Sequence, residues 1–205
     1  SGTVNAPETY FSYRLRPAGL YQVTWNAPIT NRLLLEAGAA RADGSWPTYR
    51  QPEVNVNDVS ILEQSTNVRY NSGVTYAPTQ AVPRISQRFS VSYITGSHAF
   101  KAGLQLEETF LRVANEAGTN NLDYVFRDGL PVSLNQWATP YEQRAQNKDF
   151  GFFVQDQWTF QNLTLTYGLR YLYFSGYVPP QSIPATPNGW VPERTFGEVT
   201  NVPLW

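Results

Sequence analysis

The sequence contains no cysteine and only one histidine, His98. Without cysteine, neither a disulfide framework nor a cysteine metal site can form. A single histidine excludes a histidine metal cluster within this chain. Since this one histidine lies in an expected turn, we also expect no Ser-His-Asp triad, and we expect His98 to be a solvated turn residue. We therefore expect no catalytic residue, no metal site and no cofactor, and we predict that the protein is not an enzyme.

Charge is also scarce. Charged residues make up 15% of the chain, against about 25% in soluble domains. The net charge is -1, and no run of lysine and arginine provides an electrostatic footprint for nucleic acid. Aromatic residues, in contrast, make up 15% of the chain and hydrophobic residues 41%. This composition favours a protein whose surface does not face water everywhere.

Long hydrophobic runs are missing as well. None approaches the roughly 18 residues that a membrane helix requires, and no signal peptide opens the chain. Methionine is absent, even at position 1. We therefore expect the chain to be a processed or excerpted piece.

The clearest pattern present is alternation between apolar and polar residues from Phe150 to Phe174. Two alternating runs are joined there by Gln161 and Asn162, and a two-residue connection is typical of antiparallel strands. The period of two indicates strands with one apolar and one polar face. The apolar positions are Phe152, Val154, Trp158, Phe160, Leu163, Leu165, Tyr167, Leu169, Tyr171 and Tyr173.

Similar alternation predicts further strands along the chain. Asp128-Gly129 is the strongest short hairpin signal, and Gly96-Ser97-His98 predicts another tight turn. We expect these strands at residues 20–27, 31–41, 84–95, 99–111, 122–127 and 132–138.

Tight turns alternate with longer connections, which we expect to be loops at about residues 42–83, 139–149 and 175–205. In an up-and-down sheet, all tight turns then lie at one rim and all long loops at the other. This asymmetry is typical of an outer-membrane β-barrel, with short periplasmic turns and longer extracellular loops. We therefore predict an all-β fold, an antiparallel up-and-down transmembrane β-barrel segment of about eight strands, with residues 1–205 forming one partial barrel domain.

In this fold the apolar face contacts lipid and the polar face lines a lumen. Asp156 shares the parity of the apolar residues, so we place it near the headgroup rim or bonded to a neighbouring strand. The lumen residues would contact a plug or a passing substrate; alternatively, they form mixed-charge ladders or simply face water. The candidate lumen-facing residues are Arg84, Arg88, Lys101, Gln105, Glu107, Gln155, Gln157 and Arg170.

Aromatic residues in the expected loops form a second candidate site. Trp46, Tyr49, Trp190 and Trp205 could stack on sugars or cap a ligand funnel. Alternatively, each packs against its own loop.

Several segments resemble the barrel of TonB-dependent outer-membrane receptors, specifically the Oar-like group. They read WNAPITNRLLLEAG (25–38), SYITGSHAFKAG (92–103), FRDGLPVSLNQWATP (126–140), FGFFVQDQWTFQNLTLTYGLRYLYF (150–174) and NVPLW (201–205). The resemblance implies nutrient uptake across the bacterial outer membrane by a barrel of about 22 strands, closed by a plug domain and driven by the TonB complex. The plug and the remaining strands are not recognisable in this sequence, so the resemblance implies an internal fragment.

Two other functions fit the same alternation. A soluble all-β carbohydrate- or ligand-binding module would turn its apolar face inward and use the loop aromatics. A self-contained small barrel would act as an adhesin or a pore. For the outer-membrane segment, the expected partners are the lipid bilayer, the missing plug and barrel strands, and the TonB complex through that plug.

Overall fold

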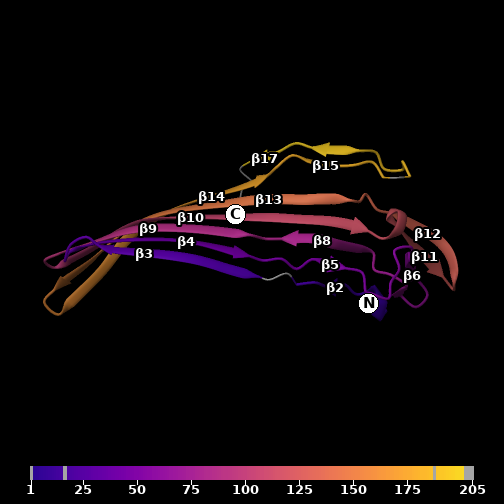
Figure 1. Ribbon diagram of the computed structural model, residues 1–205, viewed down its shortest axis with the longest axis horizontal. Helices are drawn as coiled ribbons and strands as arrows, with labels where there is room; N and C mark the ends of the chain where they lie inside the picture. Colours follow the sequence, from indigo (N-terminus) through magenta and orange to yellow (C-terminus); the bar gives the residue numbers. More distant parts are fainter. Residues whose placement is uncertain (1, 16–17, 187, 201–205) are drawn as a thin grey trace.

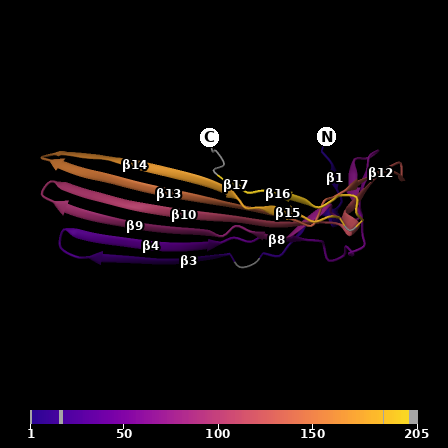
Figure 2. The same ribbon diagram turned by 90° about the horizontal axis from the view of Figure 1, so that it is seen from above.

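The computed structural model describes residues 2–15, 18–186 and 188–200. Its main feature is a sheet of long antiparallel strands lying side by side (Figure 2). The order across this sheet is β17-β14-β13-β10-β9-β4-β3, and β8 pairs with the far end of β10. The bounds of these strands are β3 Gly19–Pro28, β4 Leu33–Asp43, β8 Thr75–Ala81, β9 Arg84–Thr95, β10 His98–Ala117, β13 Tyr141–Phe160, β14 Leu163–Val178 and β17 Val199–Thr200.

Three tight turns join the long strands in pairs at one end of the molecule, on the left in Figure 1. They connect β3 to β4, β9 to β10, and β13 to β14. Gly96 adopts a positive φ of 56° in the second turn, and Gln161 a positive φ of 51° in the third. Positive φ values are what two-residue hairpin turns require, so the expected turns at these positions are confirmed.

The opposite end carries a second sheet with the strand order β1-β7-β6-β11-β12 (Figure 1). Asp128-Gly129 does form the expected hairpin between β11 and β12. Its expected position was wrong, however, because β11 pairs in parallel with β6 and not with a long strand. The bounds are β1 Val4–Asn5, β6 Ser60–Glu63, β7 Val68–Tyr70, β11 Leu122–Arg127 and β12 Leu130–Gln136.

The expected loops contain more strand than the sequence indicated. Residues 141–149 belong to β13, which runs as one strand of 20 residues alongside β10, so the loop expected at 139–149 was wrong beyond Pro140. β14 continues to Val178 before the last connection begins. The remaining short elements are η1 Pro7–Thr9, β2 Ser12–Tyr13 paired with β5 Thr48–Tyr49, η2 Thr119–Asn121, and β15 Gln181–Ile183 paired with β16 Arg194–Phe196.

The half of the long-stranded sheet nearer the tight turns has no buried apolar core in the described part of the chain. The buried apolar side chains lie at the loop end and are those of Val54, Tyr76, Ala77, Ala117 and Val125. Large apolar side chains on the long strands are instead exposed, for example Leu169 at 79% and Tyr171 at 61%. Such a surface requires a solvent other than water, since monomeric soluble proteins rarely expose large contiguous apolar patches.

The register unites these exposed side chains into one surface, the apolar face, that crosses all six long strands. One row of cross-strand partners contains Trp25, Ala37, Phe89, Leu104, Phe152 and Tyr171. The next row toward the loops contains Val23, Ala39, Gln87, Leu106, Phe150 and Tyr173. The expected alternation of faces is therefore confirmed across the sheet.

The apolar face ends abruptly one row further toward the loops. There the partners of the same parity are Tyr21, Arg41, Ile85, Glu108, Lys148 and Ser175. On β14 the apolar face extends from Leu163 to Tyr173, which spans about 34 Å along a strand and about 25 Å across a bilayer at a tilt of about 45°. That height matches the apolar band of an outer-membrane barrel.

Among the described residues no helix combines the length and the hydrophobicity needed to cross a membrane.

Candidate functional site

The sheet surface opposite the apolar face, here called the polar face, carries the candidate site. By register and parity, it holds all eight residues expected to face a lumen. Lys101 pairs with Gln155, and Gln105 pairs with Arg88. The structure thus gathers the eight residues on one surface.

A charged cluster lies near the middle of the polar face. The Lys101 ammonium group donates to Glu36 Oε2 over 2.7 Å, and the Ser90 hydroxyl donates to the same oxygen over 3.0 Å. These three residues come from β10, β4 and β9, which lie side by side. Sequence reasoning named Lys101 but missed Glu36, because nothing in one sequence fixes which residues become partners across two strands.

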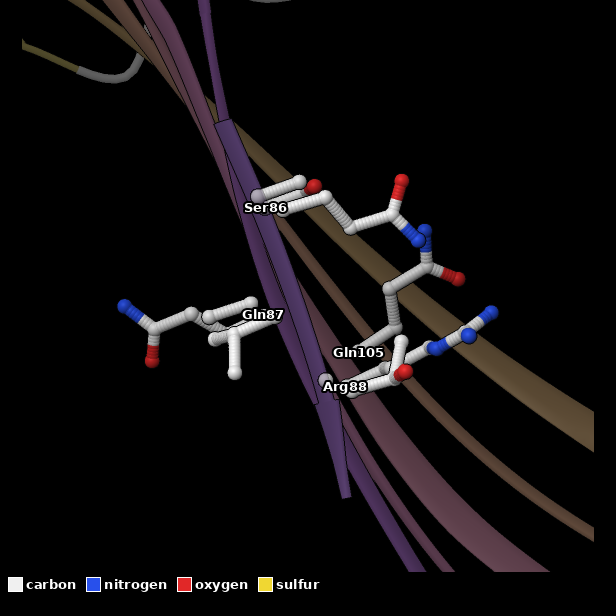
Figure 3. A pocket seen from close by; sticks show the side chains of 10 residues that line it. Ser86, Gln87, Arg88 and Gln105 are labelled. Atoms are coloured by element: carbon white, nitrogen blue, oxygen red, sulfur yellow. The ribbon is translucent and has the colours of Figure 1, made fainter. Parts of the chain in front are cut away.

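Beside this cluster the face is hollowed over β3, β4 and β9. A hollow of about 230 Å³ is lined by Gln22, Thr24, Gly38, Ala40, Ser86, Arg88 and Gln105 among others. Figure 3 shows the side chains of Ser86, Arg88 and Gln105 reaching to the same side of the strands, while Gln87 points to the other side. A second hollow of about 230 Å³ adjoins Glu36 and Lys101.

Glycines on this face let long side chains lie flat over the neighbouring strand. A Cβ atom at Gly38 would be 2.9 Å from Arg88 Nε, and one at Gly103 would be 2.7 Å from the ring of Phe153. Replacing either glycine would force these side chains to move, because real Cβ atoms essentially never approach so closely. The glycines therefore shape the polar face as much as its charged residues do.

The polar face ends at the loop side with another ion pair. Arg84 on β9 contacts Glu107 on β10, as expected for cross-strand neighbours of opposite charge. Their side chains are 57% and 22% exposed. This pair fits the mixed-charge ladder that was the alternative interpretation for the polar residues, whereas Arg88 and Gln105 line a hollow.

A second polar cluster lies on the apolar face close to the tight turns. Asp156 Oδ2 accepts hydrogen bonds from the Tyr167 hydroxyl over 2.8 Å and is 2.6 Å from His98 Nδ1. Asp156 is therefore bonded to both neighbouring strands near the turn rim, which agrees with its expected position. The expected turn position of His98 was wrong, since His98 begins β10 and stacks beside Phe100 and Trp158.

The loop aromatics do not form a shared platform. Tyr49 on β5 is held by neighbouring segments: its hydroxyl donates to the carbonyl oxygen of Pro78 on β8 over 3.3 Å, and Arg14 lies 4.9 Å from its ring centre. Trp46 leans toward Gly44, while Trp190 lies between β15 and β16 and is 63% exposed. Residues 201–205, with Trp205 and the NVPLW segment, lie outside the described residues.

Chemically, the polar face can recognise a polar solute by hydrogen bonds and charge. Within the described ranges, no group of three or more His, Asp or Glu side chains is arranged to hold a metal ion. The donors are Lys101, Arg88 and Gln105, and the acceptors are Glu36 and Gln105.

Comparison with known protein families identifies a match over most of the chain. The family model described as an outer membrane beta barrel domain matches residues 16–182. Searches among curated proteins and among solved structures each found no match. The matched region contains all six long strands and both hollows of the polar face. The chain therefore belongs to the outer membrane beta-barrel domain family, and its place is the lipid bilayer of the bacterial outer membrane.

Proposed function

We propose that the chain forms part of the barrel of a TonB-dependent receptor of the Oar-like group, which imports a scarce nutrient. The single observation that carries this proposal is the polar face, where charged and amide side chains line two hollows. In this proposal the face borders a lumen through which the nutrient passes. The protein performs no covalent chemistry.

The open edges of the sheet support a large barrel. In the described part of the chain, β3 pairs only with β4, and the outer side of β14 is paired only at Tyr177 and Val178. An unpaired strand edge in lipid costs several kcal/mol for each orphan backbone group, so both edges need further strands. Additional strands widen a barrel, and a wide barrel has room for a plug and a solute path.

The size of the loop-side structure also supports a receptor. β10 and β13 extend about ten residues past the apolar face. β8 pairs with this part of β10, and the five-stranded sheet lies at the same end of the molecule, beyond the bilayer. Structure of this size outside the membrane could capture a ligand before it reaches the polar face. A barrel whose only role is to anchor the protein in the membrane would not require this structure outside the bilayer.

The test uses the full polypeptide that carries this chain in its native bacterium. We expect deletion of its gene to slow growth when one nutrient is limiting. In a strain without TonB, we expect the intact gene to give no growth advantage over the deletion. Iron, carbohydrate, peptide and cobalamin limitation would be compared. A growth defect that is identical with and without TonB would contradict energised uptake, and an adhesion defect alone would favour an adhesin.

A variant test links the transport to the polar face. Lys101→Ala combined with Arg88→Ala should lower the uptake rate in that assay while the amount of folded receptor stays the same. The matched control is Arg32→Ala with Arg127→Ala, which removes two positive charges from the turn rim and the loop hairpin. Equal uptake by both double variants would contradict a role for the polar face.

A further inference from the structure

The outward surface just beyond the apolar face carries a cluster of basic residues on two strands, β10 and β13. Arg112 and Arg144 are direct cross-strand partners, and Lys148 lies on the same face two rows closer to the bilayer. Like charges directly opposite each other in a sheet are destabilising. An anion between them would remove that repulsion.

Glu142 neutralises only part of this charge. Its carboxylate contacts Arg112 Nε through one oxygen and lies 2.5 Å from an Arg144 Nη atom through the other. Each guanidinium has five N–H groups, so each arginine keeps donors for a further acceptor. The two arginine side chains are 59% and 51% exposed.

A hollow of about 400 Å³ adjoins the two arginines on the same surface. Its other walls include Phe110, Gln146, Tyr177 and Pro179. The Tyr177 hydroxyl lies 3.4 Å from Glu198, so Glu198 is a second acid beside the hollow. The hollow thus combines guanidinium and amide donors with an aromatic wall.

Between the hollow and the apolar face lies one row of polar and charged residues, formed by Glu108, Lys148 and Ser175. Lys148, paired with Glu108 at 3.1 Å, stands one row above Leu106, Phe150 and Tyr173. A molecule bound at the arginines could therefore lay acyl chains on these side chains. The site matches an amphiphile with an anionic headgroup.

The heights of the cations indicate the size of that headgroup. Each row lies about 7 Å further along the strands and, at the usual tilt, about 5 Å further from the bilayer centre. Lys148 is one row above the last apolar row. The arginines are three rows above that same apolar row, which places them about 15 Å further from the bilayer centre than its side chains. The polar layer of one leaflet is only about 5–8 Å thick. A simple phospholipid headgroup would reach Lys148 but not the arginines.

We propose that Arg112, Arg144 and Lys148 form a binding site for a glycolipid with a phosphorylated sugar headgroup. Phosphate accepts bidentate hydrogen bonds from arginine, and the sugar rings provide the reach from Lys148 to the arginines. The aromatic wall of Phe110 and Tyr177 packs against the sugar, and the acyl chains lie on the apolar face. The site lies on the outward surface of the sheet and is separate from the polar face, so its failure would leave the proposed transport untouched.

The test measures binding of lipid A, a diphosphorylated disaccharide lipid, to the full polypeptide in detergent by native mass spectrometry. We expect Arg112→Gln with Arg144→Gln to weaken binding at least about tenfold, the effect of losing one charge-assisted hydrogen bond. The control, Arg32→Gln with Arg127→Gln, should bind lipid A as the wild type does. Glu142→Gln should strengthen binding, because it frees arginine donors, whereas a merely structural role would make the same variant weaker or leave it unchanged.

Three further probes identify the source of the anion. Dephosphorylated lipid A should bind at least about tenfold more weakly, and millimolar inorganic phosphate should not displace lipid A. Phosphatidylglycerol should bind without any dependence on Arg112 and Arg144. Equal binding of lipid A to the wild type and the double arginine variant would overturn the proposal. Displacement by inorganic phosphate, or arginine-dependent binding of phosphatidylglycerol, would overturn the choice of a phosphorylated glycolipid.

Discussion

Replacing Gly103 with alanine tests the packing of the polar face most directly. A Cβ atom at this position would lie 2.7 Å from two ring atoms of Phe153 and 2.7 Å from the carbonyl oxygen of Phe89. The ring can rotate away, but the carbonyl belongs to the ladder between β9 and β10 and cannot move without disturbing the sheet. The variant should therefore be destabilised through its backbone as well as through a side chain.

The expected size of the effect follows from two opposing contributions. Overpacking of this kind costs about 1–3 kcal/mol. Alanine also restricts the unfolded chain, which would stabilise the fold by about 0.4–1 kcal/mol if the site had room. The difference between the centres of these two ranges is a fall of about 1 kcal/mol in the free energy of unfolding. Combining Gly103→Ala with Phe153→Ala should relieve the ring contact and leave the part caused by the Phe89 carbonyl.

The assay is urea unfolding of the full polypeptide in lipid vesicles, followed by tryptophan fluorescence. Gly197→Ala is the matched control, because no heavy atom lies within 4 Å of a Cβ atom there and its φ is not positive. Its unfolding free energy should stay within about 1 kcal/mol of the wild type, on the stabilised side. If Gly103→Ala were as stable as this control, the close approach of Phe153 and Phe89 to Gly103 would be refuted.

Three other predictions follow from particular contacts. Asp156→Ala should lower the free energy of unfolding in vesicles by about 2–3 kcal/mol, since it leaves His98 and Tyr167 without their shared acceptor; a loss below about 0.5 kcal/mol would contradict this. The Ser65 hydroxyl and backbone N–H, followed by the backbone N–H groups of Gly129 and Asp128, lower the pKa of the Glu63 carboxyl from 4.5 to about 2. Because this pKa is lowered, the stabilisation is present above about pH 4.5 and is lost as the pH falls toward 2. The protection of the β11–β12 hairpin against hydrogen exchange, taken relative to the intrinsic exchange rate at each pH, should therefore fall in that window, and Glu63→Gln should abolish this fall. The isolated 205-residue chain should associate in detergent through β3 and β14, and a monodisperse monomer with cooperative unfolding would contradict the open edges.

The strands that cross the bilayer could be predicted from the sequence because their two faces meet different solvents. Alternation along Arg84–Thr95 and Leu163–Phe174 depends only on side-chain parity, which one strand reveals by itself. The tight turns could be predicted equally well, because the backbone conformations that such turns require favour particular residues. For the same reason, the eight polar residues could be assigned to a common face before their partners were known.

Partners across strands could not be predicted, because register joins residues that lie far apart in the chain. Glu36 and Lys101 are 65 residues apart, and Asp156 and His98 are 58 residues apart. The β11–β12 hairpin shows the same limit. Its local pattern indicates a hairpin, but the pattern contains no information on whether the hairpin continues the long-stranded sheet or pairs with β6.

The first half of β13 was not predicted, because the alternation that indicates a strand stops where this strand leaves the membrane. From Phe150 to Phe160 the residues of this strand alternate between apolar and polar, because one side of the strand contacts lipid and the other side contacts polar partners. Between Tyr141 and Asp149 both sides meet water or charged neighbours, so Glu142, Arg144 and Lys148 break the alternation although the strand continues. A polar segment next to an alternating one is therefore not evidence for a loop in this family of folds. It also marks where the hydrocarbon ends, which is why the same residues that concealed the strand form the proposed headgroup site.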